Sequence, residues 1–275
     1  MDMLQAILLG LVQGLTEFLP VSSSGHLVLL QRLFGWTEPE LFFDVSVHFG
    51  TLLAVCAVFA GDLRQMASAA VALPSRVRRS GGLRPALRSD ADLRMMGLIV
   101  AGSVPTAFIG LMFHRVADRI FGSVAIVGVT LILTGILLWL TRYAGRPERT
   151  IRQFRFVDAL VIGVVQGMAI LPGISRSGST IAAALFLGID RELAGRFSFL
   201  LSLPAICGAM LLSLRDAATA SAVPASQVLT GTAVAGAVGY LALRALMRIV
   251  KRGTLHRFAP YCWALGATAL YWSFG

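Results

Sequence analysis

Charged residues are scarce in this sequence, and that scarcity limits the class of protein it can encode. Only 14% of its 275 residues are Asp, Glu, Lys or Arg, and 56% are hydrophobic. A soluble domain normally carries about 25% charged residues. We therefore expect the lipid bilayer as solvent and an all-α integral membrane protein.

The sequence also has few cysteines and no basic segment at its amino terminus. The three cysteines are odd in number and lie in apolar runs, which argues against a disulfide framework. No Lys or Arg precedes Arg32, so the basic region of a cleaved secretory signal is missing. We expect the mature chain to start near Met1.

Long apolar runs dominate what remains. Six have transmembrane length, and two further apolar regions, at roughly 4–35 and 156–190, are each broken midway by Pro, Gly and Ser. We predict six transmembrane helices plus two re-entrant pairs of broken helices. The six predicted spans are 41–60, 93–113, 121–141, 197–214, 226–243 and 258–275.

The formal net charge of +10 comes mainly from arginines between the predicted spans. These arginines are not gathered into one arm or face, so we expect no nucleic-acid partner. By the positive-inside rule the basic segments are cytoplasmic and both termini lie outside, in a multi-pass membrane protein. The basic segments are 62–92, 142–155 and 244–257.

The two broken regions resemble each other. QGLTEFLPVSSSGHL at 13–27 aligns with QGMAILPGISRSGST at 166–180 at an offset of 153 residues, which pairs Ser22 with Ser175 and Gly25 with Gly178. In the predicted topology the copies have opposite orientations. We predict one transmembrane domain, 1–275, made of two inverted repeats at about 1–143 and 156–275. Such repeats bring their breaks together near the bilayer midplane, so segments 13–26 and 166–180 should share one site.

The first break carries a carboxylate that is costly to expose to lipid. Glu17 should therefore face a wet cavity, and Gln13 lies one helical turn earlier on the same face. Together they could hold a hydrated divalent cation or position a water molecule. The alternative is that Glu17 only pairs with an arginine of the second repeat.

Three serines and an imidazole follow Pro20. A hydroxyl of Ser22, Ser23 or Ser24 near His26 could act as a nucleophile whose proton passes to a base. The alternative is that a serine only caps the following helix.

The second break supplies groups that suit an anion. The planar guanidinium of Arg176 suits phosphate oxygens, and a helix starting near Gly178 would add N–H donors. Together the two breaks would place a nucleophile, an imidazole, a carboxylate and an anion-binding arginine at one depth in the membrane. This combination indicates phosphoester or diphosphate chemistry on a lipid. The candidate phosphate-binding residues are Ser22, Ser24, Ser175, Arg176, Ser177 and Thr180.

With Gln13-x-x-x-Glu17, PVSSSGH at 20–26 and PGISRSGST at 172–180, the chain resembles the bacterial undecaprenyl-diphosphate phosphatases of the bacitracin-resistance type over essentially its full length. The resemblance implies hydrolysis of undecaprenyl diphosphate to the monophosphate carrier of cell-wall synthesis, at a site open to the periplasmic side. It also implies a location in the bacterial inner (plasma) membrane.

The same resemblance implies Glu17, Ser23, His26 and Arg176 as catalytic residues, with Ser23 the candidate nucleophile. It also implies a divalent cation, Mg²⁺ or Ca²⁺, near Gln13 and Glu17. The family motif has Glu or Gln at the first position, and Gln here leaves the metal one carboxylate fewer. Magnesium held mainly by substrate phosphates and water fits this donor set better than tight binding by the protein alone.

Other interpretations remain open at the level of sequence. A polyprenyl-phosphate transporter or flippase would also use inverted repeats with broken helices. Another class of lipid phosphatase needs a second histidine where this chain has Ala182. The remaining histidines, His48, His114 and His256, are expected to be loop or interfacial residues. The chain is compatible with a monomer or a homodimer.

Overall fold

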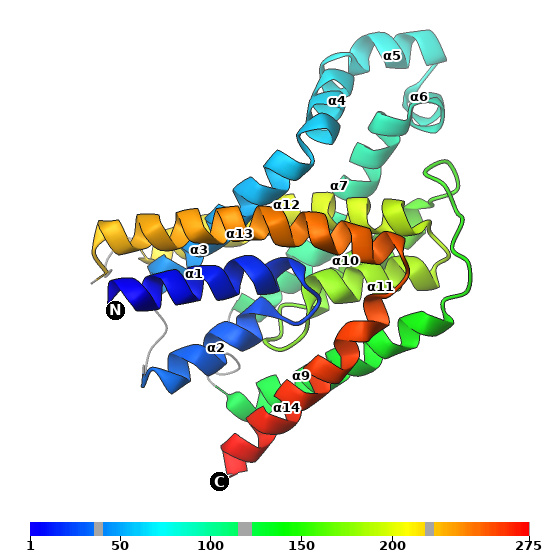
Figure 1. The fold of residues 1–275 in the computed structure, drawn as a ribbon. Helices are drawn as coiled ribbons and strands as arrows, with labels where there is room; N and C mark the ends of the chain where they lie inside the picture. The colour runs from blue at the N-terminus through cyan, green and yellow to red at the C-terminus, as the bar shows by residue number, and fades with distance from the viewer. Residues whose placement is uncertain (36–40, 115–122, 218–222, 275) are drawn as a thin grey trace.

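A computed structural model describes residues 1–35, 41–114, 123–217 and 223–274. All regular secondary structure in these ranges is helical, apart from one isolated β-bridge between Arg149 and Ile189. The helices gather into one bundle, and a helical hairpin projects from it (Figure 1). This arrangement confirms the predicted all-α class.

Each broken region forms two short helices joined by a tight break. The first pair is α1 (Met3–Phe18) and α2 (Ser23–Leu33), and the second is α10 (Phe156–Met168) and α11 (Arg176–Phe186). Ser22 caps α2 by accepting a hydrogen bond from the Gly25 N–H, and Ser175 caps α11 through Gly178 in the same way. The breaks therefore arise where proline and glycine interrupt an apolar helix and serine restarts it.

The remaining long helices form the body of the bundle. They are α3 (Leu41–Val58), α7 (Ala91–His114), α9 (Val124–Leu140), α12 (Arg191–Ala217), α13 (Ala225–Lys251) and α14 (Ala259–Phe274). Short 3₁₀ turns, η1 (Thr141–Tyr143) and η2 (Leu255–Phe258), lie at two of the connections.

Each of the six predicted spans coincides with one of these helices. In the described residues, four helices are long and apolar enough to cross a membrane, and a fifth span results if α3 and the next helix are counted together. α14 has 16 residues, fewer than the roughly 20 that a transmembrane helix needs, and it is not among these candidate spans. The chain is therefore an all-helical protein with four or five candidate membrane spans.

The segment after the first predicted span is helical rather than a loop. The chain bends by 76° after α3 and continues as α4 (Ala60–Val71), α5 (Leu73–Ser80) and α6 (Leu83–Ser89). These helices and the start of α7 form the projecting hairpin in Figure 1. Arg76 of α5 pairs with Asp90, and Arg196 of α12 pairs with Asp62 at the base of the hairpin.

Glycines allow the helices around the breaks to approach closely. Gly10 of α1 lies against the backbone of Gly231 in α13, and Gly14 lies against Ala235, so α1 and α13 run parallel. The pairs Gly102–Gly163 and Ile109–Gly167 show that α7 and α10 are also parallel. By the same criterion α9 and α14 are antiparallel, because Gly128 lies against Gly266 and Gly135 against Ala259.

A core of large side chains supports the two breaks. Phe18, at the end of α1, is fully buried, and its ring meets Phe199 of α12 edge-on at a centroid distance of 5.8 Å. Phe199 also stacks on Phe59 at 6.2 Å. This packing fixes the end of α1, which carries the carboxylate described next.

Candidate active site

The two breaks meet, as the sequence predicts. The Gly173 N–H donates to Ser22 Oγ at 3.1 Å, and Ser177 Oγ donates to the Phe18 carbonyl at 2.9 Å. Gly173 has a positive φ of 90°, and a Cβ there would collide with Thr130 of α9, so the close approach requires glycine. Ser22 has a φ of 68°, which is costly for a residue with a side chain. The junction is therefore tightly constrained.

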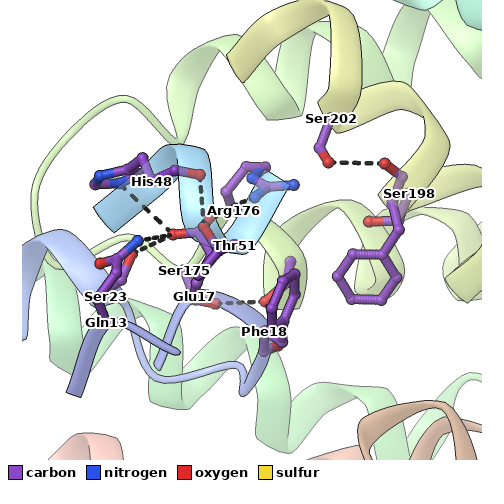
Figure 2. A network of polar contacts seen from close by, with 12 residues as sticks. Gln13, Glu17, Phe18, Ser23, His48, Thr51, Ser175, Arg176, Ser198 and Ser202 are labelled. Carbon is purple, nitrogen blue, oxygen red and sulfur yellow. Dashed lines mark hydrogen bonds and ion pairs between the residues drawn. The ribbon is translucent and has the colours of Figure 1, made fainter. Parts of the chain in front are cut away.

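Glu17 lies at the centre of this junction (Figure 2). Its Oε2 accepts hydrogen bonds from Ser23 Oγ at 2.7 Å and from Gln13 Nε2 at 3.1 Å. Its Oε1 accepts from Arg176 Nη2, which comes from the second break. The Glu17 side chain is 7% exposed and that of Arg176 is 16% exposed. The sequence-predicted residues Gln13, Glu17, Ser23 and Arg176 are thus in one connected polar cluster.

Two buried atoms of this cluster have no hydrogen-bond partner. They are Arg176 Nη1 and Gln13 Oε1. Buried polar groups are normally paired, so an unpaired donor and an unpaired acceptor beside one carboxylate point to a bound ligand. The donor suits an anion and the acceptor suits a cation.

The other predicted phosphate-binding hydroxyls take part in contacts within the protein. Ser22 and Ser175 cap their helices and lie near Ser24 Oγ and Ser177 Oγ, each at 3.3 Å. Thr180 Oγ1 donates to the Arg176 carbonyl at 2.8 Å. Ser22, Ser175, Ser177 and Thr180 are almost fully buried. Their role toward a phosphate stays a prediction.

His26 is directed away from Glu17. Its Nδ1 lies 2.7 Å from the Ser22 carbonyl, and its Nε2 lies 2.7 Å from the Tyr261 hydroxyl. The two rings are stacked, with centroids 5.7 Å apart. Because a carbonyl only accepts, Nδ1 carries the proton, and in the neutral ring Nε2 accepts from Tyr261. The hydrogen bond of Ser23 goes to Glu17, so the carboxylate is the closer proton acceptor.

His48 is the site residue that sequence reasoning missed. It was expected to be a loop or interfacial residue, but it lies within α3 with Nε2 at 3.7 Å from Glu17 Oε2. The expectation was wrong because the repeat alignment directs attention to the breaks, whereas α3 packs beside them. The available signal was an ionisable residue inside an apolar span, which normally faces a polar interior. His256 lies in η2 against Trp139, and His114 ends α7.

The residues around Glu17 can be tested for their fit to a divalent cation. Among the described residues no group of three His, Cys, Asp or Glu side chains has metal-binding geometry. The Glu17 carboxylate is one oxygen ligand, and a half-turn of the Gln13 amide, whose nitrogen now faces Glu17, would bring Oε1 beside it as a second. This set fits a hard cation that also takes water and substrate oxygens as ligands.

Two similar proteins of known name share that name. Undecaprenyl-diphosphatase from Desulfosudis oleivorans is 53% identical over 272 residues, covering 98% of each chain. The protein of that name from Desulfatibacillum aliphaticivorans is 48% identical over 275 residues, covering both chains fully. Residues 6–268 match the family described as bacitracin resistance protein BacA. The chain belongs to the bacitracin resistance protein BacA family.

Proposed function

We propose that this protein hydrolyses undecaprenyl diphosphate to undecaprenyl phosphate and inorganic phosphate, recycling the lipid carrier of cell-wall synthesis and conferring bacitracin resistance. The observation that carries the proposal is the contact of Ser23 and Arg176, from opposite repeats, with the same Glu17 carboxylate. The relatives named undecaprenyl-diphosphatase support undecaprenyl diphosphate as the substrate.

Ser23 is the nucleophile in the proposed mechanism. Its hydroxyl already donates to Glu17 Oε2 at 2.7 Å, so Glu17 takes the proton as Ser23 Oγ attacks the terminal phosphorus. The bond from phosphorus to the bridging oxygen breaks, and undecaprenyl phosphate leaves. Glu17 passes its proton to the departing phosphate and is again a carboxylate. It then deprotonates a water molecule that attacks the phosphoserine; the bond between phosphorus and Ser23 Oγ breaks, Ser23 recovers the proton from Glu17, and inorganic phosphate is released.

Arg176 holds the diphosphate during this reaction. Nη2 bonds to Glu17, whereas Nη1 is buried and unpaired, so one guanidinium can contact both the base and a phosphate oxygen. Phosphoryl transfer depends mainly on positioning and charge neutralisation, and this clamp supplies both. Of the hydroxyls predicted to bind phosphate, Ser177 donates to the Phe18 carbonyl, and we assign it to the support of the break. The others would act next to Arg176.

Gln13 and Glu17 would hold the divalent cation, Mg²⁺ or Ca²⁺, together with phosphate oxygens. When bound, the cation supplies neutralisation of the charge on the diphosphate. In the structure Gln13 Nε2 donates to Glu17 at 3.1 Å, and a half-turn of the amide would present Oε1 to the cation instead. His26 would act as proton acceptor only if its ring turned away from Tyr261, so we place it second to Glu17.

We further propose six spans and two inverted repeats within one domain. α2 and α11 have the same length, and both of their ends, like the starts of α1 and α10, are offset by 153 positions. In this topology α13 crosses from outside to inside and should run parallel to α1. Likewise α10 should run parallel to α7, and α9 should be antiparallel to α14. The glycine contacts between these helices agree with each direction. The site would face the periplasm and the basic segments the cytoplasm, in the bacterial inner membrane.

Phosphate release by Ser23→Ala tests the proposed function. Purified protein in detergent is given undecaprenyl diphosphate, and inorganic phosphate is measured for the wild type and the variant. We expect wild-type release and a loss of at least about 100-fold in the variant. A polyprenyl-phosphate flippase has no hydrolysis to lose, so absence of release by the folded wild type would contradict the proposal.

A further inference from the structure

Three polar side chains approach the same oxygen of Glu17, and two of them donate hydrogen bonds to it. Glu17 Oε2 faces His48 Nε2 at 3.7 Å, beyond the N–H···O range of about 2.7–3.2 Å, so the pair is close without a hydrogen bond. The Gln13 amide lies at the same oxygen. Figure 2 shows His48, Ser23 and Gln13 approaching the carboxylate from this side, with Arg176 on the other.

The orientation of His48 is fixed by its other ring nitrogen. Nδ1 lies 2.7 Å from the carbonyl of Asp44, one turn earlier in α3. A carbonyl only accepts, so Nδ1 carries the proton and a neutral ring directs the Nε2 lone pair at Glu17. Histidines that bind metals almost always donate their second N–H to a carbonyl or carboxylate in this manner.

Gln13 offers a further ligand once its amide turns, because in the structure Nε2 faces Glu17 and Oε1 is the other end of the amide. Its side chain is fully buried, and Oε1 has no partner. A half-turn of the amide would put Oε1 where Nε2 now lies, 3.1 Å from Glu17 Oε2. Adjacent ligands in an octahedral site with bonds of about 2.1 Å are about 3.0 Å apart, which matches this separation.

We propose that His48 Nε2 binds the same divalent cation as Glu17 and Gln13, so that α3 supplies a third ligand beside the two breaks. The inference rests on the cation of the proposed function and adds a nitrogen ligand to it. To reach the separation of about 3.0 Å between adjacent ligands, His48 Nε2 would move closer to Glu17 Oε2 by about 0.7 Å. Imidazole suits transition-metal ions, so the mixed set favours Mn²⁺ over Ca²⁺.

Charge balance links this cation to the anion. Glu17 and Arg176 together carry no net charge, so a divalent ion beside them is strongly favoured only when phosphate oxygens arrive. We therefore expect Mn²⁺ to bind more tightly in the presence of methylenediphosphonate, a diphosphate analogue that cannot be hydrolysed at its bridge.

Electron spin-echo spectroscopy of bound Mn²⁺ tests the ligand directly, because it detects a coordinated ¹⁴N nucleus without requiring turnover. The full chain, with any histidine tag removed, is loaded with Mn²⁺ and methylenediphosphonate in a nitrogen-free buffer and detergent. We expect ¹⁴N coupling in the wild type and in His26→Gln, and its loss in His48→Gln. His48→Leu should raise the Kd for Mn²⁺ about tenfold or more; His48→Gln, whose amide oxygen can still bind, should do so less.

The outcomes separate this inference from the proposed function. Bound Mn²⁺ without ¹⁴N coupling in the wild type would overturn the role of His48 but leave the cation in place. In that case His48 carries a proton on Nε2 and forms an ion pair with Glu17. Coupling that disappears in His26→Gln instead would assign the ligand to His26. No Mn²⁺ binding by the folded wild type would remove the cation itself, and the phosphate-release assay judges hydrolysis separately.

Discussion

Replacing Arg176 by lysine keeps the positive charge but removes the second donor arm. In the structure Nη2 contacts Glu17, and the buried Nη1 is left for a phosphate oxygen. A lysine ammonium is a point charge on a flexible stem and cannot span both groups in the same geometry. Arg176→Lys should therefore keep one of the two contacts and lose the other.

The size of the effect follows from the lost contact. A hydrogen bond to a charged group contributes about 1.5–3 kcal/mol. At about 1.36 kcal/mol for each factor of ten, this corresponds to a decrease in kcat/KM of about 10- to 150-fold. The loss should fall on kcat as well as on KM if the contact strengthens as charge shifts in the transition state.

The assay is phosphate release from undecaprenyl diphosphate over a range of substrate concentrations. Arg142→Lys is the matched control, because Arg142 is exposed and packs over Trp139 away from Glu17. We expect the control to stay within about twofold of the wild type. Near-normal kcat/KM in a folded Arg176→Lys enzyme would refute the clamp and leave Arg176 as a structural partner of Glu17.

Three further predictions concern the fold. Gly163→Ala should destabilise the protein by about 1–3 kcal/mol, because the new Cβ would lie 2.8 Å from the Gly102 carbonyl carbon. The control Gly208→Ala meets no atom within 4 Å and should be neutral or slightly stabilising. Thermal unfolding in detergent compares the two variants. Ser177→Ala should lower stability by about 1–3 kcal/mol with KM unchanged, because it leaves the Phe18 carbonyl unpaired; a raised KM at unchanged stability would favour phosphate binding instead. Single cysteines in 62–92 should resist an impermeant reagent in intact cells, and their labelling would overturn the topology.

The sequence predicted that the two breaks meet, because the breaks are local features. Proline, glycine and serine interrupt an apolar helix at a definite place, and the 153-residue offset pairs one break with the other. The contact between Glu17 and Arg176 follows from that pairing alone. Inverted repeats with discontinuous helices leave few other ways to satisfy the freed backbone groups.

The environment of each imidazole could not be predicted in the same way. His26 is close to Ser23 in sequence, but a helical turn directs its ring to Tyr261, which lies 235 residues later. His48 is remote from both breaks in sequence and reaches Glu17 only because α3 packs beside α1 and α13. The bend after α3 was missed for a similar reason, since the apolar run gives no sign of a 76° turn. These features depend on tertiary packing, which motif spacing does not report.

Trapping the covalent intermediate tests the central claim most directly. Wild-type protein is mixed with undecaprenyl diphosphate labelled in the terminal phosphate and quenched within a single turnover, and the labelled peptide is mapped. The account predicts phosphate on Ser23, with no label trapped in Ser23→Ala and hydrolysis lowered in parallel. Label on His26, or single-turnover hydrolysis by Ser23→Ala within a few-fold of the wild-type rate, would contradict Ser23 as the nucleophile.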